Sequence, residues 1–377
     1  MVSESRIHLV NFCRKLAVNA VFFLVALHFL KLGFKGWEIG AVTSLYAFAP
    51  LLFSFPTGWA NDRFSIKEII HGGLALFSLM FLVLSQVHGF IPAAAVFLFL
   101  GLANNALDIS INNLYYKDET AIDQNKKYSR LVFWQSLGAA VGPIVGGIIV
   151  TSAGFPTLFI VFAVFLLAAQ AFVPSLNNIR FHRVPRQVYR GNLLRPKTLL
   201  FSVMIFVIGL HWGLEGTVYS PFLKQYFNLS TFALSLYISL ALLGMALSQL
   251  LIGSIRFDLR VNRRLFILSL VLSGAGLILM VNRSLALSFV FRLVHELGDG
   301  LLGALVILFI SRLFERESIG GSSAVLQTVM TCGHMVGALA FSSIGFRFGL
   351  AYPFFVAGGL LVANSGFGLY CFRKAEY

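Results

Sequence analysis

The sequence predicts an all-α membrane protein that crosses the bilayer with twelve helices. The 377 residues are 58% hydrophobic and only 12% charged, whereas a soluble domain carries about 25% charged residues. Apolar runs close to the ~20 residues that cross a bilayer recur along the whole chain. Because helices satisfy their own backbone hydrogen bonds in hydrocarbon, such runs indicate a helical bundle. The runs are continuous rather than alternating, which disfavours a β-barrel.

The apolar runs place the helices one after another between short polar segments. The first run contains Arg14 and Lys15, is long, and lacks a small-residue cleavage pattern. It therefore predicts a transmembrane helix and not a cleaved signal peptide. Span nine is short and span ten is long. In chain order, the predicted spans are 7–31, 38–58, 68–88, 91–115, 128–152, 155–175, 198–223, 231–254, 265–281, 285–312, 319–345 and 349–372.

Basic residues gather in the loops on one face of the predicted bundle. This positive-inside pattern predicts an integral plasma (inner) membrane protein with both termini in the cytoplasm. It also accounts for the net charge of +14 without a nucleic-acid partner. The loops on this face contain Arg63, Lys67, Lys117, Lys126, Lys127, Arg130, Arg180, Arg183, Arg186, Arg190, Arg195, Lys197, Arg256, Arg260, Arg263, Arg264, Arg312 and Arg316. The opposite face holds only Lys31, Lys35, Lys224, Arg283 and Arg347.

A long polar segment in the middle of the chain divides six spans from six. It predicts an N-terminal six-helix bundle at 1–176, a basic cytoplasmic linker at 177–197 and a C-terminal six-helix bundle at 198–377. The three cysteines lie in or beside apolar spans, without the spacing of metal ligands or of a disulfide framework.

The segment between spans two and three carries the first family signal. Gly58, Asp62, Arg63 and Lys67 match a pattern that runs roughly G-x-x-x-D-R-x-G-R-K, with Ser65 where the second Gly is usual. The segment resembles the loop signature of the major facilitator superfamily (MFS). The resemblance implies an MFS fold of two pseudo-symmetric bundles. It also implies gating roles: Gly58 packs span two on span eleven, Asp62 caps the N-terminal dipole of span eleven, and the two basic residues pair with cytoplasmic groups.

Span five carries a second match, Gly138-x-x-x-Gly142-Pro143-x-x-Gly146-Gly147. It resembles the G-x-x-x-G-P-x-x-G-G motif common in the family's exporters that exchange drugs for protons, and so favours antiport. Physically, glycines four apart leave a groove for a neighbouring helix, and the proline bends the span. Plain close packing is the alternative explanation. The sequence also departs from the best-known drug-exporter groups, because Phe97 stands where an Arg is common in span four.

Ionisable residues within the spans are the candidate functional residues, because each is expensive in hydrocarbon. They concentrate on spans one, four, seven and ten, which are the helices that line the central cavity in the resembled family. A carboxylate in a low-dielectric cavity binds a proton more readily than one in water. The predicted cavity residues are Arg14 in span one; Asn104, Asn105, Asp108 and Asn112 on one face of span four; His211 and Glu215 in span seven; and Arg292, Glu296 and Asp299 in span ten.

Glu296 and Asp299, modulated by Arg292, are the leading candidates for proton binding, followed by Asp108 and Glu215. Arg292 and Glu296 are four residues apart, so a structural ion pair is an equal alternative. Two roles stay open for Arg14: it holds an anionic group of the substrate, or it neutralises Asp108. Lys15 is expected to extend to the inner interface.

Two rival classes fit parts of the sequence. The run His295-Glu296-Leu297-Gly298-Asp299 resembles the zinc-protease pattern H-E-x-x-H with Asp replacing the second His. No third ligand is identifiable from the sequence, and we expect neither a metal, nor a cofactor, nor an enzyme. A non-transporting receptor or scaffold is the second rival, disfavoured by the cost of the buried charges. A nucleotide-driven pump is disfavoured because no G-x-x-x-x-G-K-[ST] loop occurs.

These observations together predict a secondary active transporter with alternating access around a midplane cavity. The first expectation is export of a small amphipathic or apolar organic solute in exchange for protons. The alternative is a proton-coupled symporter for a small anionic solute, favoured by the cationic residues of spans one and ten. The expected partners are a small-molecule substrate, protons and membrane lipids, with the monomer as the functional unit.

Overall fold

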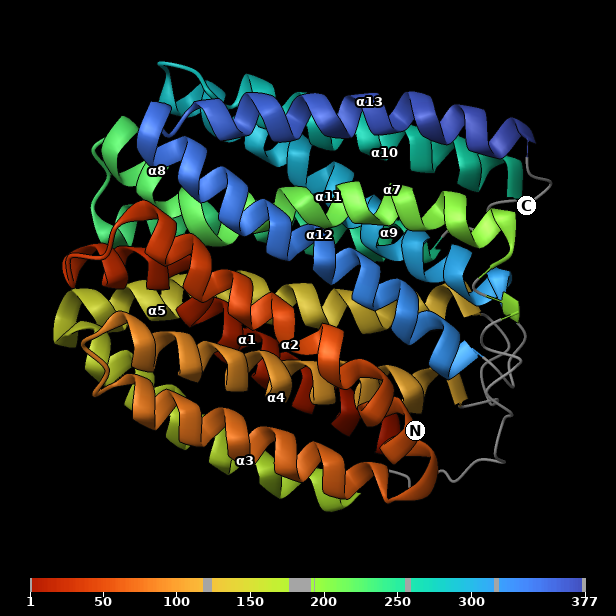
Figure 1. Cartoon of the computed structure of the whole chain (residues 1–377), viewed down its shortest axis with the longest axis horizontal. Coiled ribbons are helices and arrows are strands. Elements are labelled where there is room, and N and C mark those ends of the chain that lie inside the picture. Colours follow the sequence, from red (N-terminus) through yellow and green to blue (C-terminus); the bar gives the residue numbers. More distant parts are fainter. Residues whose placement is uncertain are drawn as a thin grey trace.

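The protein is a bundle of long helices that lie side by side (Figure 1). The computed structural model describes residues 2–117, 124–175, 191–192, 194–254, 259–314 and 319–374. Every regular element within these ranges is a helix, and none of these residues forms a strand. The prediction of an all-α protein is therefore confirmed for these residues.

The first bundle contains helices α1 to α5 and a short 3₁₀ helix. Helix α1 packs on α5, and α4 packs on both α2 and α3. A glycine at 154 with φ of +81° interrupts the long α5, so α5 and the 3₁₀ helix together make two passes. The elements are α1 (Val2–Lys31), α2 (Gly36–Arg63), α3 (Ile66–Leu84), α4 (Phe90–Lys117), α5 (Gln124–Ala169) and η1 (Gln170–Ser175).

The second bundle repeats this arrangement with helices α7 to α13. One pass consists of three consecutive pieces, α7, a π-helical turn η2, and α8. Helix α10 packs on α11 and α13, and α12 packs on α7. The elements are α7 (Pro196–Leu214), η2 (Glu215–Tyr219), α8 (Ser220–Tyr226), α9 (Thr231–Ser254), α10 (Leu259–Leu279), α11 (Leu285–Leu313), α12 (Ile319–Phe348) and α13 (Tyr352–Lys374).

Ten helices among the described residues are long and apolar enough to cross a membrane. One of them, Tyr128–Pro174, has 47 residues and contains two of the predicted spans. Helix α2 is outside this set of ten. Dividing the long helix at Gly154 and including α2 gives the twelve passes that the sequence predicts.

Some predicted span ends differ from the helix ends by five residues or more. Span nine was placed at 265–281, whereas α10 begins at Leu259, and the end of span two differs as well. The sequence places the end of span two at residue 58, but α2 continues to Arg63. The helical bonding persists because Phe64 still donates its N–H to the carbonyl oxygen of Ala60 at 2.8 Å. Only at Phe64 and Ser65 does the backbone become extended. Gly58 and Asp62 therefore belong to a helix, and the connection to α3 is two residues long.

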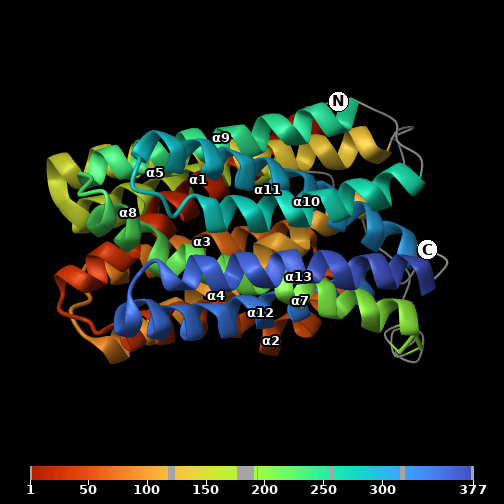
Figure 2. The ribbon, with the colours of Figure 1, turned by 90° about the horizontal axis from the view of Figure 1, so that it is seen from above.

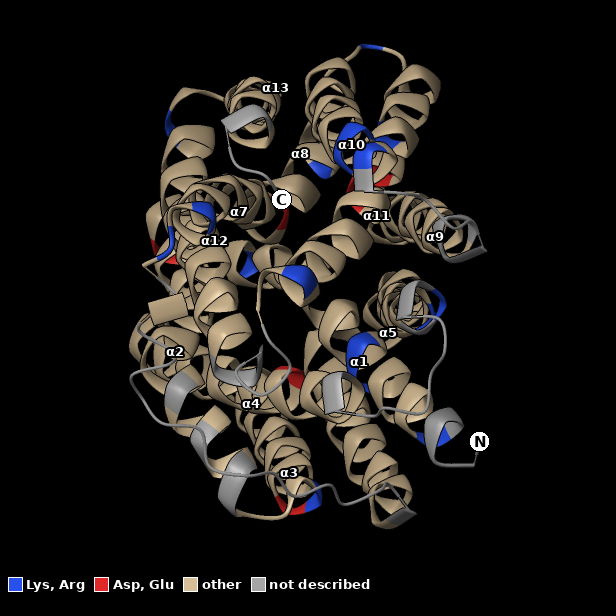
Figure 3. Ribbon diagram, turned by 90° about the vertical axis from the view of Figure 1, so that its right-hand side faces the viewer, with Lys and Arg blue, Asp and Glu red and all other residues tan. Residues whose placement is uncertain are grey.

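The two bundles face each other across two helix pairs, α2 with α12 and α5 with α9 (Figures 1 and 2). Both ends of the chain lie at the same end of the molecule (Figure 1). Seen from that end, Lys and Arg occupy the near ends of α3 and α10 (Figure 3). The predicted linker 177–197 lies mostly outside the described residues, so its boundaries stay a prediction.

Candidate functional site

A cavity of about 400 Å³ lies between the two bundles. Helices of both bundles line it, and the lining reaches Asn113 on α4, Ile310 on α11 and Ser323 on α12. These residues lie near the helix ends on the side of the chain termini. Seven of the ten predicted cavity residues line it directly, namely Asn104, Asn105, Asp108, Asn112, Glu215, Glu296 and Asp299. The other three, Arg14, His211 and Arg292, are outside the lining and bind residues that belong to it.

Helix α4 presents one polar face to this cavity. Asn104, Asp108 and Asn112 are four residues apart, which places them on the same side of a helix, and all three line the cavity. The amide of Asn104 donates to Asp108 Oδ2 at 2.8 Å. Asn105 accepts a hydrogen bond from Ser54 of α2 at 3.0 Å. The predicted stripe is therefore a continuous polar wall.

Arg14 is fully buried and binds this wall from α1. Its guanidinium donates to Asp108 Oδ1 at 2.6 Å, to Asn11 at 3.0 Å and to Asn104 at 3.3 Å. Of the two roles left open by the sequence, the geometry matches the neutralisation of Asp108. A buried charge needs such a partner, because an unpaired one is strongly destabilising.

Lys15 does not extend to the inner interface. Its Nζ lies 3.5 Å from Asp108 Oδ1, and its side chain lines the cavity. The reason is depth: α1 begins at Val2, so Lys15 is about 20 Å along the helix at a rise of 1.5 Å per residue. The first bundle therefore contributes two cations and one carboxylate to the cavity.

A π-helical turn shapes the opposite wall. It spans Glu215–Tyr219 and joins α7 to α8. Pro221 follows it and has no N–H to donate, which removes one regular helical bond at this point. The turn brings Glu215 and Tyr219 to the same partner, Arg292 of α11: the Glu215 carboxylate is 2.5 Å from its Nη2, and the guanidinium carbon is 4.3 Å from the Tyr219 ring centre. Single π-turns of this kind occur frequently at functional sites.

Arg292 also forms an ion pair with Glu296, one helical turn away on α11. The structural ion pair that the spacing allows is therefore present. Arg292 is fully buried, and Glu296 is nearly so. One guanidinium thus holds two carboxylates, from two different helices.

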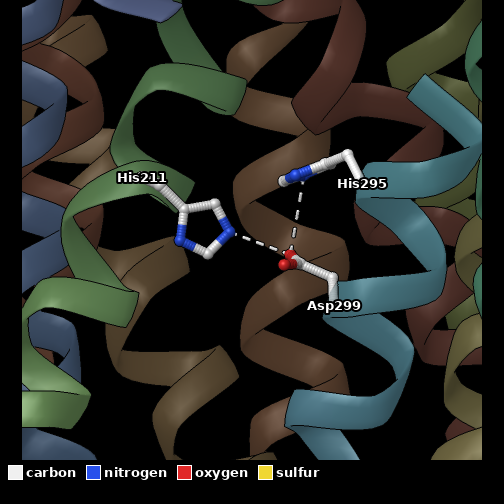
Figure 4. A group of neighbouring side chains, drawn as sticks. All are labelled: His211, His295 and Asp299. Atoms are coloured by element: carbon white, nitrogen blue, oxygen red, sulfur yellow. Dashed lines mark hydrogen bonds and ion pairs between the residues drawn. The ribbon is translucent and has the colours of Figure 1, made fainter. Parts of the chain in front are cut away.

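Asp299 is the centre of a second group on α11 (Figure 4). Its Oδ2 is 2.8 Å from His211 Nε2 and 3.8 Å from His295 Nε2. Trp212 donates to the same oxygen at 3.2 Å, and Ser273 of α10 donates to Oδ1 at 2.6 Å. His211 is the third member that the H-E-x-x-D pattern lacked in the sequence. It comes from α7, 84 residues before the pattern begins.

Several residues around this cavity were not predicted from the sequence. Ser273 and Tyr219 hold the cluster from positions that sequence reasoning treated as ordinary span residues. The signal for Ser273 was one of two serines, Ser269 and Ser273, in the otherwise apolar run of span nine. The aromatic lining residues had no distinguishing signal among thirty-nine Phe, eleven Tyr and four Trp residues. They include Phe22, Tyr46 and Trp212.

The two walls differ in charge. With its two cations and one carboxylate, the wall formed by α1 and α4 has an excess of one positive charge. On the opposite wall, Arg292 pairs with Glu215 and Glu296. Asp299 binds His211 instead, so this wall has an excess of two negative charges when both histidines are neutral. This second wall can therefore take up protons or a cation with a net electrostatic gain.

The glycines of the span-five motif are helix contacts. A Cβ at Gly142 would lie 2.6 Å from the Leu16 carbonyl oxygen of α1, and Gly138 and Gly146 approach α1 in the same way. Gly147 instead meets Ser235 of α9 in the second bundle. Next to Pro143, the N–H of Ile144 donates to Ser239 of α9 at 2.9 Å. The motif therefore packs α5 simultaneously on its own bundle and on the other one.

The loop-signature residues lie at the end of α2 and the start of α3. No described atom lies within 4 Å of a Cβ at Gly58, so tight packing is not seen there. The side chains of Asp62 and Arg63 are outside the described part of the chain. Lys67 donates to the Pro174 carbonyl oxygen of η1 at 2.8 Å. Close contact between α2 and α12 occurs near the opposite end, where a Cβ at Gly40 would lie 2.9 Å from the Ser342 Cβ.

Comparison with known proteins agrees with this architecture. A sequence model described as Major Facilitator Superfamily matches residues 7–190 and 201–376. Methyl viologen resistance protein SmvA of Salmonella typhimurium (strain LT2) is 25% identical over 324 residues, covering 83% of this chain and 62% of that protein. The chain thus spans about three fifths of the length of that relative.

Two further proteins extend the comparison. Multidrug resistance protein 2 of Bacillus subtilis (strain 168) is 24% identical over 361 residues, covering 88% of this chain and 86% of that protein. The crystal structure of a mutant of the nucleoside transporter NupG superposes with a TM-score of 0.77 at 16% identity, covering 98% of this chain and 99% of that one. Such a low identity supports the fold alone.

Proposed function

The chain belongs to the major facilitator superfamily, and we propose that it exports a small amphipathic or apolar organic solute in exchange for protons. Membership makes it an integral membrane transporter of small molecules, and not an enzyme. The exchange mechanism, its direction and the solute class are the proposed part. Proton coupling rests on one observation, the convergence of four carboxylates from both bundles on one cavity, of which Glu296 and Asp299 are buried and Asp108 and Glu215 are partly buried.

We assign proton coupling to the cavity wall that carries an excess of negative charge, the wall formed by α11 and the π-helical turn. Glu296 and Asp299 lie one turn apart on α11 and line the cavity, so a proton reaches either through water. Asp299 is hydrogen-bonded to His211, whose proton it shares at 2.8 Å. Glu296 competes with Glu215 for the single guanidinium of Arg292. Protonating one of them leaves the other fully paired, which gives the cluster two stable charge states.

The solute class follows from the rest of the lining. Aromatic and aliphatic side chains such as Phe22, Tyr46, Trp212, Met245 and Leu302 alternate with the amides of α4. Binding sites for small organic molecules have this composition, mostly apolar with a few polar groups that fix orientation. The volume of about 400 Å³ is at the small end of the usual range.

Two features favour export. The names of the two bacterial relatives refer to resistance, against methyl viologen and against multiple drugs. The span-five sequence also matches the motif of the family's proton-exchanging exporters. Since one relative is considerably longer than this chain, its activity extends to this chain only as part of the proposal.

A specific observation favours the second candidate, proton-coupled uptake of a small anionic solute. Lys15 lines the cavity with its Nζ 3.5 Å from Asp108, and its side chain is 23% exposed. A solute carboxylate could compete with Asp108 for this ammonium group. Arg14 does not serve this purpose as well, because it is fully buried behind Asn104 and Asp108.

Transport by purified protein in vesicles tests the proposal. Solutes that raise the melting temperature are first selected from a panel that includes methyl viologen, because a ligand stabilises the native state by mass action. Each is then given to vesicles that contain a pH dye. Antiport acidifies the compartment that the solute leaves, whereas symport alkalinises it. Symport of the stabilising solutes would disprove the export proposal and establish the second candidate.

Substitutions locate the coupling residues. Glu296→Gln and Asp299→Asn should abolish proton-driven uphill transport but preserve solute–solute exchange. Glu68→Gln is the matched control, because Glu68 is an exposed carboxylate in the first turn of α3. If both cavity variants still drive uphill transport, these two residues do not couple protons.

The remaining parts of the proposal concern orientation and assembly. We propose that both termini are cytoplasmic, that the bundles comprise 1–176 and 198–377, and that the monomer transports in contact with membrane lipids. The lining reaches the termini end of the bundle, while α2 and α12 contact each other near the opposite end. This arrangement corresponds to a state open to the cytoplasm. Labelling of a terminal cysteine in inverted and right-side-out vesicles tests the orientation.

A further inference from the structure

We propose that His211, His295 and Asp299 form a binding site for a divalent transition-metal ion such as Zn²⁺. The three side chains point toward one another from α7 and α11 (Figure 4). One nitrogen of each imidazole and one carboxylate oxygen all lie within 4.8 Å of one another. All three residues are buried, with His211 and His295 at 1% and 0% exposure. The site would tie the two helices together next to the cavity.

The ligand atoms have separations that suit a small ion. Around a tetrahedral ion with bonds of about 2.0–2.1 Å, neighbouring ligand atoms are about 3.3 Å apart. The Asp299 Oδ2 atom is 2.8 Å from His211 Nε2 and 3.8 Å from His295 Nε2. These two distances would each have to change by about half an ångström, and the two imidazole nitrogens, which lie within 4.8 Å of each other, would have to come to a similar separation. Asp299 lines the cavity, so an ion can enter and keep a water as its fourth ligand.

Ser273 of α10 fixes two of the three ligands in the orientation that metal binding requires. His295 Nδ1 faces the Ser273 carbonyl oxygen at 2.8 Å. A carbonyl oxygen only accepts, so Nδ1 carries the proton in neutral His295. The Nε2 atom, which lies 3.3 Å from Glu215 Oε1 and 3.8 Å from Asp299 Oδ2, is then the nitrogen left to bind an ion. The Ser273 hydroxyl donates to Asp299 Oδ1 at 2.6 Å, which leaves Oδ2 for the ion. Metal-binding histidines and carboxylates are commonly held by outer hydrogen bonds of this type.

The charge of the surroundings favours a dication. Arg292 is engaged by Glu215 and Glu296, so it does not neutralise Asp299. The wall then carries an excess of two negative charges with neutral histidines. Two imidazoles and a carboxylate select transition metals over Mg²⁺ and Ca²⁺, which prefer oxygen ligands.

Metal binding stands independently of the proposed transport reaction, although an ion and a coupling proton would use some of the same atoms. The test uses the full chain, purified without a polyhistidine tag, treated with chelator and dialysed. Isothermal titration with Zn²⁺ should give about one equivalent bound per chain. X-ray absorption of the loaded protein should show only nitrogen and oxygen ligands at about 2.0–2.1 Å.

Variants assign the site. Binding of Zn²⁺ should be lost in each of the three ligand variants, His211→Gln, His295→Gln and Asp299→Asn. His334→Asn should still bind one Zn²⁺ per chain, because His334 lines the same cavity but lies outside the group of three. Ser273→Ala keeps all three ligands and should weaken binding by about 10–100-fold. If a ligand variant misfolds, its loss of Zn²⁺ binding says nothing about the site. The Ser273→Ala variant, in which all three ligands remain, then provides the test. The proposal is overturned if folded wild-type protein binds no Zn²⁺ saturably, or if binding survives the ligand variants, or if Ser273→Ala leaves the affinity unchanged.

Discussion

Arg292 of α11 and Glu215 of the π-helical turn form a buried ion pair with a 2.5 Å contact between Nη2 and Oε1. The pair joins two helices that both line the cavity between the bundles, and the same guanidinium also binds Glu296. Because the Arg292 side chain is fully buried, water does not reach its guanidinium to replace the carboxylate of Glu215 or of Glu296. The charge of this residue therefore holds the acidic wall of the cavity together.

Removing this charge should destabilise the protein. Arg292→Gln leaves Glu215 and Glu296 without their cation, and breaking a buried ion pair costs about 3–5 kcal/mol. The melting temperature of the purified protein should fall accordingly. Arg283→Gln is the matched control, since Arg283 is exposed beside the start of α11, and it should leave the melting temperature nearly unchanged. Equal melting temperatures for the two variants would contradict the role given to Arg292.

The Arg14–Asp108 pair of the first bundle should behave as a coupled unit. Asp108→Leu leaves the fully buried Arg14 without a carboxylate and should cost about 3–5 kcal/mol. Arg14→Met should cost less, because the partly buried Asp108 keeps Lys15 at 3.5 Å. The double variant replaces both groups by apolar ones and should cost less than the sum of the single changes, by about 0.5–3 kcal/mol. Chemical or thermal unfolding of the four proteins gives this coupling energy. Additive effects would show that the 2.6 Å contact contributes nothing to stability.

The fold was predictable because membrane spans follow from local composition. Apolar length sets each helix, and the loop charges divide the chain. The end of α2 was misplaced because the apolar run stops near Gly58. The helical hydrogen bonds continue to Phe64, and they do not depend on apolar composition. The two passes of α5 were separated correctly, since Gly154 and Pro156 mark the interruption.

Which residues surround the cavity was largely predictable from the sequence, but how they pair was not. Helical spacing placed Asn104, Asp108 and Asn112 on one face, as the cavity lining confirms. Contacts between distant helices, such as His211 with Asp299, depend on how α7 and α11 pack, which periodicity does not encode. Lys15 illustrates the same limit, because its partner Asp108 lies on another helix.

Close contact between α1 and α5 should make the span-five glycines intolerant of side chains. A Cβ at Gly142 would lie 2.6 Å from the Leu16 carbonyl oxygen and 2.7 Å from the Ala20 nitrogen. Gly142→Ala must therefore separate the two helices, and we expect a loss of about 1–3 kcal/mol, the usual cost of overpacking.

Gly359→Ala on α13 is the control for this substitution, because nothing lies within 4 Å of its Cβ. There the added methyl should be neutral or slightly stabilising, since Ala is the better helix former by about 1 kcal/mol. Thermal melting of both variants measures the difference. A melting temperature of Gly142→Ala at or above that of Gly359→Ala would refute the close contact.

The contact between α2 and α12 provides a test of alternating access. The Cβ position of Gly40 is 2.9 Å from the Ser342 Cβ, somewhat closer than the ~3.8 Å typical of a disulfide. A small outward shift therefore allows Gly40→Cys and Ser342→Cys to cross-link, in a protein whose three native cysteines are replaced by Ala. Because alternating access requires the bundles to separate at this end, the oxidised double variant should bind solute but not transport it. Reduction should restore transport. Each single variant, oxidised in parallel, should transport as well as the cysteine-free parent. Full transport by protein shown to be cross-linked on a gel would mean that the bundles do not move apart at this contact.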